Sequence, residues 1–365
     1  MNNSDIPRLR LHNQHISHQT LHQPEEMVRW LGAIQSQEYA PAKWSVGMRL
    51  LDATDDSVDQ AFQSGKILRT HVMRPTWHFV VPDDIRWLLA LTAPRVHAFN
   101  AHYYRRSKLE DATLARANDI IGNAVTGGRH LTRLELESVL ERSGIPRNDG
   151  LRSGLILMHA ELDAVICSGP RRGKQFTYAL LAERAPQARH LERDEALAEL
   201  TARYFTGHGP AQVHDFAWWS GLTVADAKAG IEMVKPQLAS EVVNGKTYWF
   251  SQHCSPLTPA PEPSPRAYLL PTYDEYGIGY KDRKDIIDPE HTDQADPYKI
   301  PGTPYFSMIA IDGKIVGFWK RTLHKSEVAI ETHIFKPLNE AETHALTQEI
   351  DRYSRFLGLP ATLLT

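Results

Sequence analysis

The sequence predicts an α+β protein built from three tandem helical units and a C-terminal antiparallel β-barrel. Two observations lead to this prediction. A pattern of a helix, a short turn, a second helix and two strands recurs three times before residue 255. Beyond that point, short strands replace the helical periodicity. A helix-turn-helix followed by a two-strand hairpin is the layout of a winged helix-turn-helix unit, so we expect three such units in tandem.

The changes of pattern also give the expected boundaries. A chain of 365 residues is long enough for several packed units. We expect a first unit with a long following helix at 1–125, a second unit at 126–190 and a third unit at 191–255. A barrel with a closing helix is expected at 266–365.

The first unit begins at Pro24, which opens a helix that we expect to continue through Gln35. Two further helical segments follow at 42–51 and 58–64. Two strands are expected at 68–73 and 76–80, and a long helix at 83–106. The two strands enclose Arg74 and Pro75, which form the turn of the first hairpin.

The second unit carries the most basic hairpin. Thr132 is the expected N-cap of a helix at 133–142, and a second helix is expected at 151–162. Strands are expected at 165–167 and 175–179. The loop between the strands holds Arg171, Arg172 and Lys174 among glycines. Cations at a tight turn suit a wing that lies near phosphates, although a solvated hairpin explains them equally well.

The third unit has the clearest signals. Helices are expected at 195–205, 212–219 and 225–234, the last of them in the place of a recognition helix. Gly221 is the expected C-cap of the second helix, and Thr223 with Asp226 forms a capping box for the third. The alternating segment 241–250 surrounds Asn244-Gly245, which is a strong hairpin signal.

The C-terminal part begins with a proline-rich linker at 254–265. Strands are expected at 268–270, 306–311, 314–320 and 328–334, and a closing amphipathic helix at 340–357. Asp312-Gly313 is the expected two-residue turn between two of these strands. These elements suggest the small antiparallel barrel.

Composition and charge restrict the function. The 41 basic and 44 acidic residues give a net charge of −3, which argues against a protein that coats nucleic acid through charge alone. No run of 18 apolar residues occurs, so we expect no membrane span. Two cysteines cannot make a disulfide framework and indicate a reducing cytoplasm. No heptad repeat demands a dimer, so we expect a monomer.

Several short motifs occur in a fixed order along the chain. They are Gln35-Ser36-Gln37 with Trp44 and Arg49, then Arg69-Thr70-His71 and Met73 to His78, then Gly209-Pro210 with Asp215 to Gly221, then Leu270 to Tyr276 with Gly279-Tyr280 and Arg283, and last Asp312-Gly313 with Gly317 and Trp319. In this order and spacing, from about Arg8 to Gly358, the chain resembles the AlkZ/YcaQ-type family of winged-helix DNA glycosylases. Ser36, where relatives have an apolar residue, and Pro75, where they often have glycine, depart from the family pattern.

The resemblance implies three winged helix units and a C-terminal β-barrel that together form a cationic channel for double-stranded DNA. It also implies hydrolysis of the N-glycosidic bond of N3- or N7-alkylated purines, or unhooking of interstrand crosslinks. Catalysis in this family is carried by a Gln-x-Gln or Gln-x-Asp motif, which Gln35 and Gln37 match.

A glutamine pair is chemically reasonable for such a reaction. A purine alkylated at N3 or N7 is cationic and leaves without a strong general acid, so the enzyme has to position water and stabilise an oxocarbenium-like state. A glutamine carbonyl can orient water and offer a dipole. On a regular helix, however, residues i and i+2 point to different sides. Both side chains therefore reach one pocket only if the helix ends or distorts here, which Pro41 favours.

Other residues are candidates for supporting roles. Asp274 and Glu275 follow an apolar strand beside two tyrosines and are either part of the site or partners of a cation such as Arg283. His78 is a possible supporting residue. Expected DNA contacts come from basic side chains, namely Arg69, Arg74, Arg171, Arg172, Lys174 and Arg283.

No His-Glu-x-x-His or Cys-x-x-Cys spacing and no glycine-rich phosphate loop occurs in the sequence, so we expect no metal and no cofactor. The leading alternative is a winged-helix DNA-binding protein or regulator without catalysis. A protein–protein scaffold, or a resistance protein that sequesters a DNA-damaging natural product, is a third class.

Overall fold

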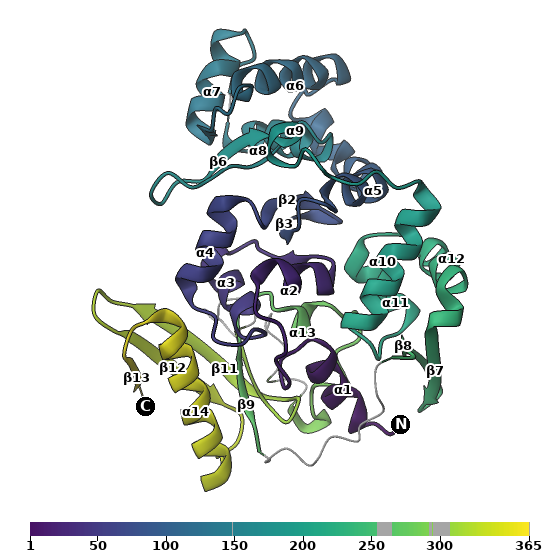
Figure 1. The fold of residues 1–365 in the computed structure, drawn as a ribbon, viewed down its shortest axis with the longest axis vertical. Coiled ribbons are helices and arrows are strands. Elements are labelled where there is room, and N and C mark those ends of the chain that lie inside the picture. Colours follow the sequence, from purple (N-terminus) through teal and green to yellow (C-terminus); the bar gives the residue numbers. More distant parts are fainter. Residues whose placement is uncertain (148, 254–264, 292–293, 295–306, 365) are drawn as a thin grey trace. The chain divides into compact units, whose positions relative to one another are not determined.

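The computed structural model describes residues 1–147, 149–253, 265–291, 294 and 307–364 (Figure 1). The chain divides into two compact units that each draw on separate stretches of sequence. Unit 1 comprises Met1–Val58, Ala198–Trp219 and Thr223–Thr365, and unit 2 comprises Asp59–Leu197 and Ser220–Leu222. Residues 254–264, which make up almost all of the expected linker, lie outside the described residues.

Unit 2 contains an antiparallel hairpin and a mostly helical subdomain. Its elements are β2 Leu68–Val72, β3 Arg74–Val80, α5 Ile85–Arg106, α6 Asp111–Val125, β4 Leu131–Thr132, α7 Arg133–Arg142, α8 Gly150–Leu162, β5 Ile166–Ser168, β6 Thr177–Leu180 and α9 Leu181–Arg184. The expected hairpin and helices of this region are confirmed, while α6 was not expected. Strands β4, β6 and β5 pair in that order, and apolar residues of α6, α7 and α8 bury one continuous core.

Unit 1 begins with helices packed around the N-terminal segment. They are α1 Asp5–Asn13, α2 Pro24–Leu31 and α3 Tyr39–Gly47, with the short strand β1 Ile34–Gln35 between the last two. The boundary between the units falls within the next helix, α4 Asp55–Ser64. The prediction that the second of these helices continues through Gln35 is wrong. Gly32 follows Leu31 with a φ of +81°, a backbone conformation that ends helices and favours glycine.

The third helical segment matches its prediction closely. It consists of α10 Arg193–Gly207, α11 Val213–Ser220, α12 Val224–Val234, the 3₁₀ turn η1 Lys235–Gln237, β7 Leu238–Val243 and β8 Lys246–Ser251. Thr223 and Asp226 form the expected reciprocal capping box at the start of α12. Asn244 and Gly245 both have positive φ in the hairpin turn, as a tight hairpin with right-handed strand twist requires.

The C-terminal strands form an open sheet in the described residues. Its elements are β9 Ala267–Leu270, α13 Glu275–Ile278, η2 Pro289–His291, β10 Met308–Ile311, β11 Lys314–Leu323, β12 Val328–Ile334, α14 Glu340–Leu357 and β13 Ala361–Leu364. The strand order is β13-β12-β11-β10-β9. Asp312 and Gly313 make the expected turn between β10 and β11.

The expected β-barrel is therefore not found. Strands β9 and β13 are the two edges of the sheet and do not pair with each other within the described residues. Strand β13, which was not expected, runs parallel to β12, so the chain must cross over between them. Helix α14 makes this crossover and packs on the sheet against β9 and β13 (Figure 1). A helix that covers one face in this way buries the sheet without closure.

Among the described residues, no helix is long and apolar enough to cross a membrane. Cys167 is buried and unpaired with another cysteine, and burial raises the pKa of its thiol to about 12. This thiol is therefore protonated at neutral pH and packs as a small hydrophobic group.

The capping box of α12 gives a test of the helical assignment. Replacing Thr223 with Ala removes the acceptor for the backbone N–H of Asp226 and should lower the free energy of unfolding by about 1 kcal/mol in urea titrations. Thr223→Ser keeps the hydroxyl and should stay close to the wild type. Equal losses in the two variants would contradict a capping role.

Candidate active site around the Gln-x-Gln segment

The Gln-x-Gln segment lies between α2 and α3 rather than on a helix, with Gln35 in β1 and a bend at Gln37. Gln35 is the last residue of β1 and is only 7% exposed, Ser36 is buried and Gln37 is half-buried. Because neither glutamine lies on a helix, the objection that a regular helix would direct their side chains to different sides does not apply here.

The backbone of this segment is held by a buried carboxylate. The amide of Gln35 donates to Glu275 Oε1 at 2.8 Å. Glu275 is completely buried, and its other oxygen accepts the indole N–H of Trp219 at 2.8 Å and lies 3.4 Å from His208 Nε2. A buried carboxylate is tolerated when several donors satisfy it. Glu275 thus joins the Gln-x-Gln segment to α10 and α11.

Burial lowers the pKa of His208 below its ordinary value of 6.5, although Glu275 acts in the opposite direction. The imidazole is therefore neutral at pH 7 and donates to Glu275 from Nε2. Its ring stacks on Tyr204, with centroids 4.7 Å apart. Gly279 lets the His208 ring lie close to the backbone of α13. A Cβ at position 279 would lie 2.6 Å from the Glu275 carbonyl oxygen and 3.0 Å from the His208 ring.

Asp274, the neighbour of Glu275, pairs with Arg49 in the interior of unit 1. Both oxygens of Asp274 accept from the guanidinium, at 2.7 and 2.8 Å, and both side chains are completely buried. Ser45 Oγ also donates to Asp274 at 2.6 Å, and the amide of Tyr276 donates at 2.9 Å. The carboxylate has four donors, so it is fully occupied. The cation that it pairs with is Arg49 and not Arg283.

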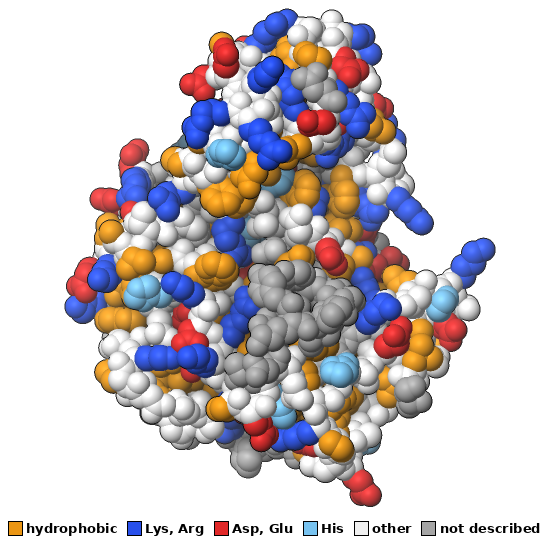
Figure 2. All heavy atoms as spheres, turned by 180° about the vertical axis from the view of Figure 1, so that it is seen from behind, with side chains coloured by type: hydrophobic (Ala, Val, Ile, Leu, Met, Phe, Trp, Pro, Cys, Tyr) orange, Lys and Arg blue, Asp and Glu red, His pale blue; other side chains and the backbone are white. Residues whose placement is uncertain are grey.

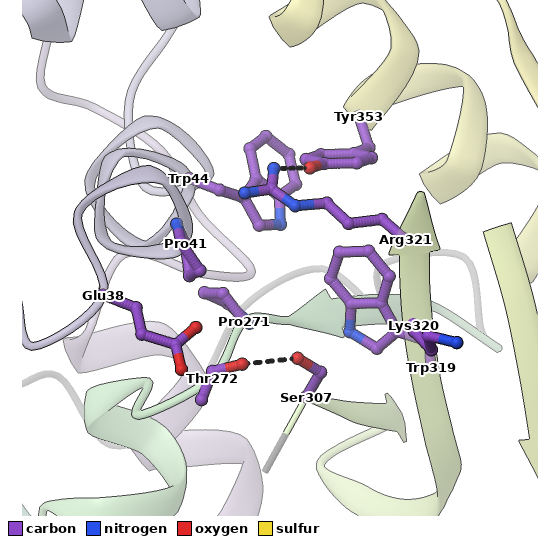
Figure 3. A pocket seen from close by; sticks show the side chains of 10 residues that line it. All are labelled: Glu38, Pro41, Trp44, Pro271, Thr272, Ser307, Trp319, Lys320, Arg321 and Tyr353. Atoms are coloured by element: carbon purple, nitrogen blue, oxygen red, sulfur yellow. Dashed lines mark hydrogen bonds between the residues drawn. The ribbon is translucent and has the colours of Figure 1, made fainter. Parts of the chain in front are cut away.

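A pocket of about 210 Å³ lies beside these two segments (Figure 3). Glu38, which follows Gln37, is on one side, and Pro271 and Thr272, which precede Asp274, are on another. Pro41 and Ser307 also line the pocket. The rest of the lining consists of three aromatic rings and two cations, Trp44, Trp319, Tyr353, Lys320 and Arg321. The indoles of Trp44 and Trp319 are fixed by N–H donation to the carbonyls of Leu269 and Leu270.

The polar groups of this pocket differ in their freedom to move. The Arg321 guanidinium donates to the hydroxyl of Tyr353, and Thr272 and Ser307 share a hydrogen bond of 2.8 Å (Figure 3). Glu38 is exposed, and Figure 3 shows its carboxylate beside Thr272. The pocket therefore combines rigid aromatic walls with one carboxylate and one anchored guanidinium.

The expected DNA contacts on the basic hairpin lie in unit 2. Arg171 and Arg172 pair with Asp59 at 3.4 Å and with Glu135 at 2.7 Å. Lys174 is exposed at the turn between β5 and β6. Phosphate contact by the two arginines would have to compete with the acidic partners that hold them.

The other expected cations and His78 occupy varied environments. Arg69 is only 7% exposed, with its guanidinium over the rings of Trp77 and Phe176. Arg74 is half-buried at the start of β3, and Arg283 is half-buried in unit 1 after α13. His78 is buried on β3, with Nδ1 3.0 Å from the Thr76 carbonyl. Figure 2 shows basic side chains interspersed with acidic and apolar ones on the face that it displays.

The structure thus brings Gln35 and Glu275 into contact, while the adjacent residue Asp274 pairs with Arg49. The contact of Glu275 with Gln35, and the parts played by Trp219 and His208, were not predicted from the sequence. Gly32 was a usable signal that the helix ends before Gln35, because a glycine directly after an apolar helical turn marks a helix end.

Comparison with known proteins defines the class of this fold. The solved structure of Streptomyces sahachiroi DNA glycosylase AlkZ matches it with a TM-score of 0.82 at 21% sequence identity, covering 100% of both chains. A Streptomyces sahachiroi protein named interstrand DNA cross-link repair glycosylase is 25% identical over 328 residues, which is 85% of each chain. The fold is that of a solved DNA glycosylase.

The family follows from the sequence itself. The family described as DNA glycosylase AlkZ-like matches residues 28–356, which include the Gln-x-Gln segment and the loop that carries Glu275. The chain belongs to this family of AlkZ-like DNA glycosylases.

The buried ion pair of Arg49 can be tested by removing one or both charges. Arg49→Met leaves Asp274 charged and buried, and should lower the free energy of unfolding by about 3–5 kcal/mol. The double variant Arg49→Met with Asp274→Leu removes the unpaired charge and should recover part of that loss in denaturant titrations. A double variant less stable than the single one would rule out the pair as the anchor of the loop.

Proposed function

We propose that this DNA glycosylase hydrolyses the N-glycosidic bond of cationic N3- or N7-alkylated purines in double-stranded DNA, and unhooks DNA crosslinks that are attached through such purines. Gln35 and Gln37 would position the attacking water. The observation that carries this proposal is the hydrogen bond from the Gln35 amide to the buried carboxylate of Glu275, because it holds the backbone of the Gln-x-Gln segment in place.

The residue types suit a cationic leaving group. An alkylated purine leaves as a neutral base, so positioning of water and stabilisation of the sugar cation are the remaining tasks. Glutamine carbonyls accept hydrogen bonds from water but take up no proton at neutral pH. The crosslink substrate is supported by the similar Streptomyces sahachiroi protein, whose name is interstrand DNA cross-link repair glycosylase.

Glu275 would act as a positioning residue rather than as the base. Its oxygens are occupied by the Gln35 amide and the Trp219 indole, with His208 close by. A general base needs an oxygen within hydrogen-bond reach of the attacking water. The remaining role of this carboxylate is to fix Gln35, and its negative charge would also favour a nearby sugar cation.

The pocket beside Glu38 would accept the extruded base. Glycosylases move the target nucleotide out of the stack into a pocket and hold it by stacking on flat side chains. An apolar cavity of about 150 Å³ holds a benzene ring, so the volume of about 210 Å³ is suitable for a base that enters part of the way or reshapes the walls slightly. The Glu38 carboxylate is complementary to a cationic purine.

The recurring helices and hairpins would serve as winged helix units on the DNA. The helical core with its paired strands in unit 2, and the segment from α10 to β8, have the required order of elements. The exposed tip with Lys174 would approach phosphates. Three units in all, with the first beginning at α2, and a monomeric state remain proposals.

Removing the two glutamine side chains tests the catalytic assignment. Gln35→Ala and Gln37→Ala should each lower single-turnover release of N7-methylguanine by about 10²- to 10³-fold, the usual effect of losing one pre-organised polar group. Release of a purine-linked crosslink should fall in parallel. The measurement uses labelled duplex DNA with enzyme in excess, so that chemistry rather than product release sets the rate.

Glu141→Gln serves as the matched control, because Glu141 is an exposed residue on α7 of unit 2 and has no assigned part in the Gln-x-Gln segment. DNA affinity, measured by fluorescence anisotropy, should be unchanged in all variants. If the wild type binds duplex DNA and releases no cationic base, the chain is a DNA-binding protein without catalysis. If the alanine variants retain the wild-type rate, catalysis does not use the glutamines.

Filling the pocket tests its role as the base site. Ser307→Trp places an indole where Figure 3 shows the hydroxyl of Ser307 next to Thr272 and should lower base release at least about tenfold, because an extruded base has no room to enter. Ser307→Ala removes only the hydrogen bond and should behave like the wild type. Wild-type release by the tryptophan variant, with unchanged DNA affinity, would place the extruded base elsewhere.

A further inference from the structure

A second cluster of chemically active side chains lies in unit 2 and is separate from the glutamine segment. It consists of His97 on α5, His159 on α8 and Asp163, which follows the last residue of α8. One ligand atom of each residue lies within 4.8 Å of the others. Sequence motifs could not reveal this cluster, because His97 is far from the other two in the chain and only His159 and Asp163 share a local spacing.

The distances suit a small divalent cation. Asp163 Oδ1 lies 3.1 Å from His97 Nε2, and Asp163 Oδ2 lies 3.3 Å from His159 Nδ1. Ligand atoms around a tetrahedral zinc ion are about 3.4 Å apart, given metal–ligand distances of about 2.0–2.1 Å. Each of these two nitrogen–oxygen separations is close to that spacing, but they involve different oxygens of Asp163. Zinc binding therefore needs both carboxylate oxygens as ligands, or a rotation of the side chains that brings both rings towards one oxygen.

The groups behind the cluster are those that metal ligands use. His97 Nδ1 lies 3.2 Å from the hydroxyl of Tyr104, and Asn118 donates to Asp163 Oδ2 at 2.7 Å. A metal-binding histidine usually donates its other N–H to a fixed acceptor, and a ligating carboxylate is usually hydrogen-bonded in turn. The Tyr104 hydroxyl can accept from His97 or donate to it, so the same residues suit both the metal-bound and the metal-free tautomer.

We propose that His97, His159 and Asp163 form a zinc-type site that clamps α5 to α8, with Asn118 of α6 as its outer partner. Two imidazoles and one carboxylate favour zinc or a related transition metal over magnesium or calcium, which prefer oxygen ligands. The side chains of His97 and Asp163 are 26% and 38% exposed, so water can enter and fill the fourth position. The site ties three helices of one unit together and does not depend on the proposed catalysis.

The alternative is a cluster held by hydrogen bonds alone, in which Asp163 accepts from both rings. The variant His97→Gln distinguishes a zinc site from a cluster held by hydrogen bonds alone. A glutamine amide can still donate to Asp163 but is a poor zinc ligand. Asp163→Asn is the second variant. His102→Gln is the matched control, since His102 is an exposed histidine on the same helix and lies outside the cluster.

The experiment titrates the EDTA-treated full-length protein with zinc by calorimetry and with cobalt(II) by visible absorption. We expect one site per chain in the wild type and in His102→Gln, with the intense cobalt bands of a four-coordinate ion. His97→Gln and Asp163→Asn should weaken this binding at least tenfold. Zinc at about 100 times its wild-type Kd should raise the melting temperature of the wild type by about 5 °C, and that of the two site variants by at most about half as much.

The metal-free melting temperatures decide whether a variant is folded. If a site variant melts cooperatively within a few degrees of the metal-free wild type, its zinc affinity tests the site directly. Equal zinc and cobalt binding by the wild type and the two site variants would overturn the proposal and leave the hydrogen-bonded cluster. If His97→Gln does not fold, the comparison of Asp163→Asn with the wild type decides in the same way.

Discussion

The buried ion pair between Arg49 and Asp274 is the constraint on which the glutamine segment depends. Two charges without solvent exposure are costly to bury, and their mutual attraction offsets that cost only when the geometry is good and the remaining polar atoms are satisfied. Here the pair is bidentate, and Ser45 and the Tyr276 amide supply further donors. Because Arg49 follows α3 and Asp274 is the N-cap of α13, the pair fixes the C-terminal loop on the N-terminal helices.

Glu275 takes its position from that pair, since it is the next residue in the chain. Its carboxylate enters a space between the Gln35 amide and the Trp219 indole, with the neutral His208 ring beside it. Moving Asp274 would therefore move the acceptor of Gln35. Residues from four separate parts of the sequence meet within a few ångströms, so the conformation of the Gln-x-Gln segment is a property of the whole unit rather than of its own sequence.

Local signals explain what the sequence could predict. The capping box at Thr223, the Asn244-Gly245 turn and helix α14 depend on neighbouring residues only, and all three are present. The two wrong predictions, of the helix through Gln35 and of the closed barrel, depend on contacts between residues far apart in the sequence. The helix was expected to pass Gly32 because the apolar pattern continues beyond it, and the sheet was expected to close because the parallel strand β13 leaves no hairpin signal. The partner of Asp274 was left open, because nothing in a sequence pairs one buried carboxylate with Arg49.

The environment of Gln35 also restricts which side chain can stand there. A carboxylate at position 35 would lie close to Glu275, whose charge is already buried, and like charges at short range in a dry site disfavour ionisation. A neutral amide avoids this conflict and keeps an oxygen that orients water. It gives up the capacity to accept a proton, so the proposed reaction is limited to bases that leave without further activation. On this view the buried carboxylate that holds the segment and the proposed preference for cationic lesions have one electrostatic origin.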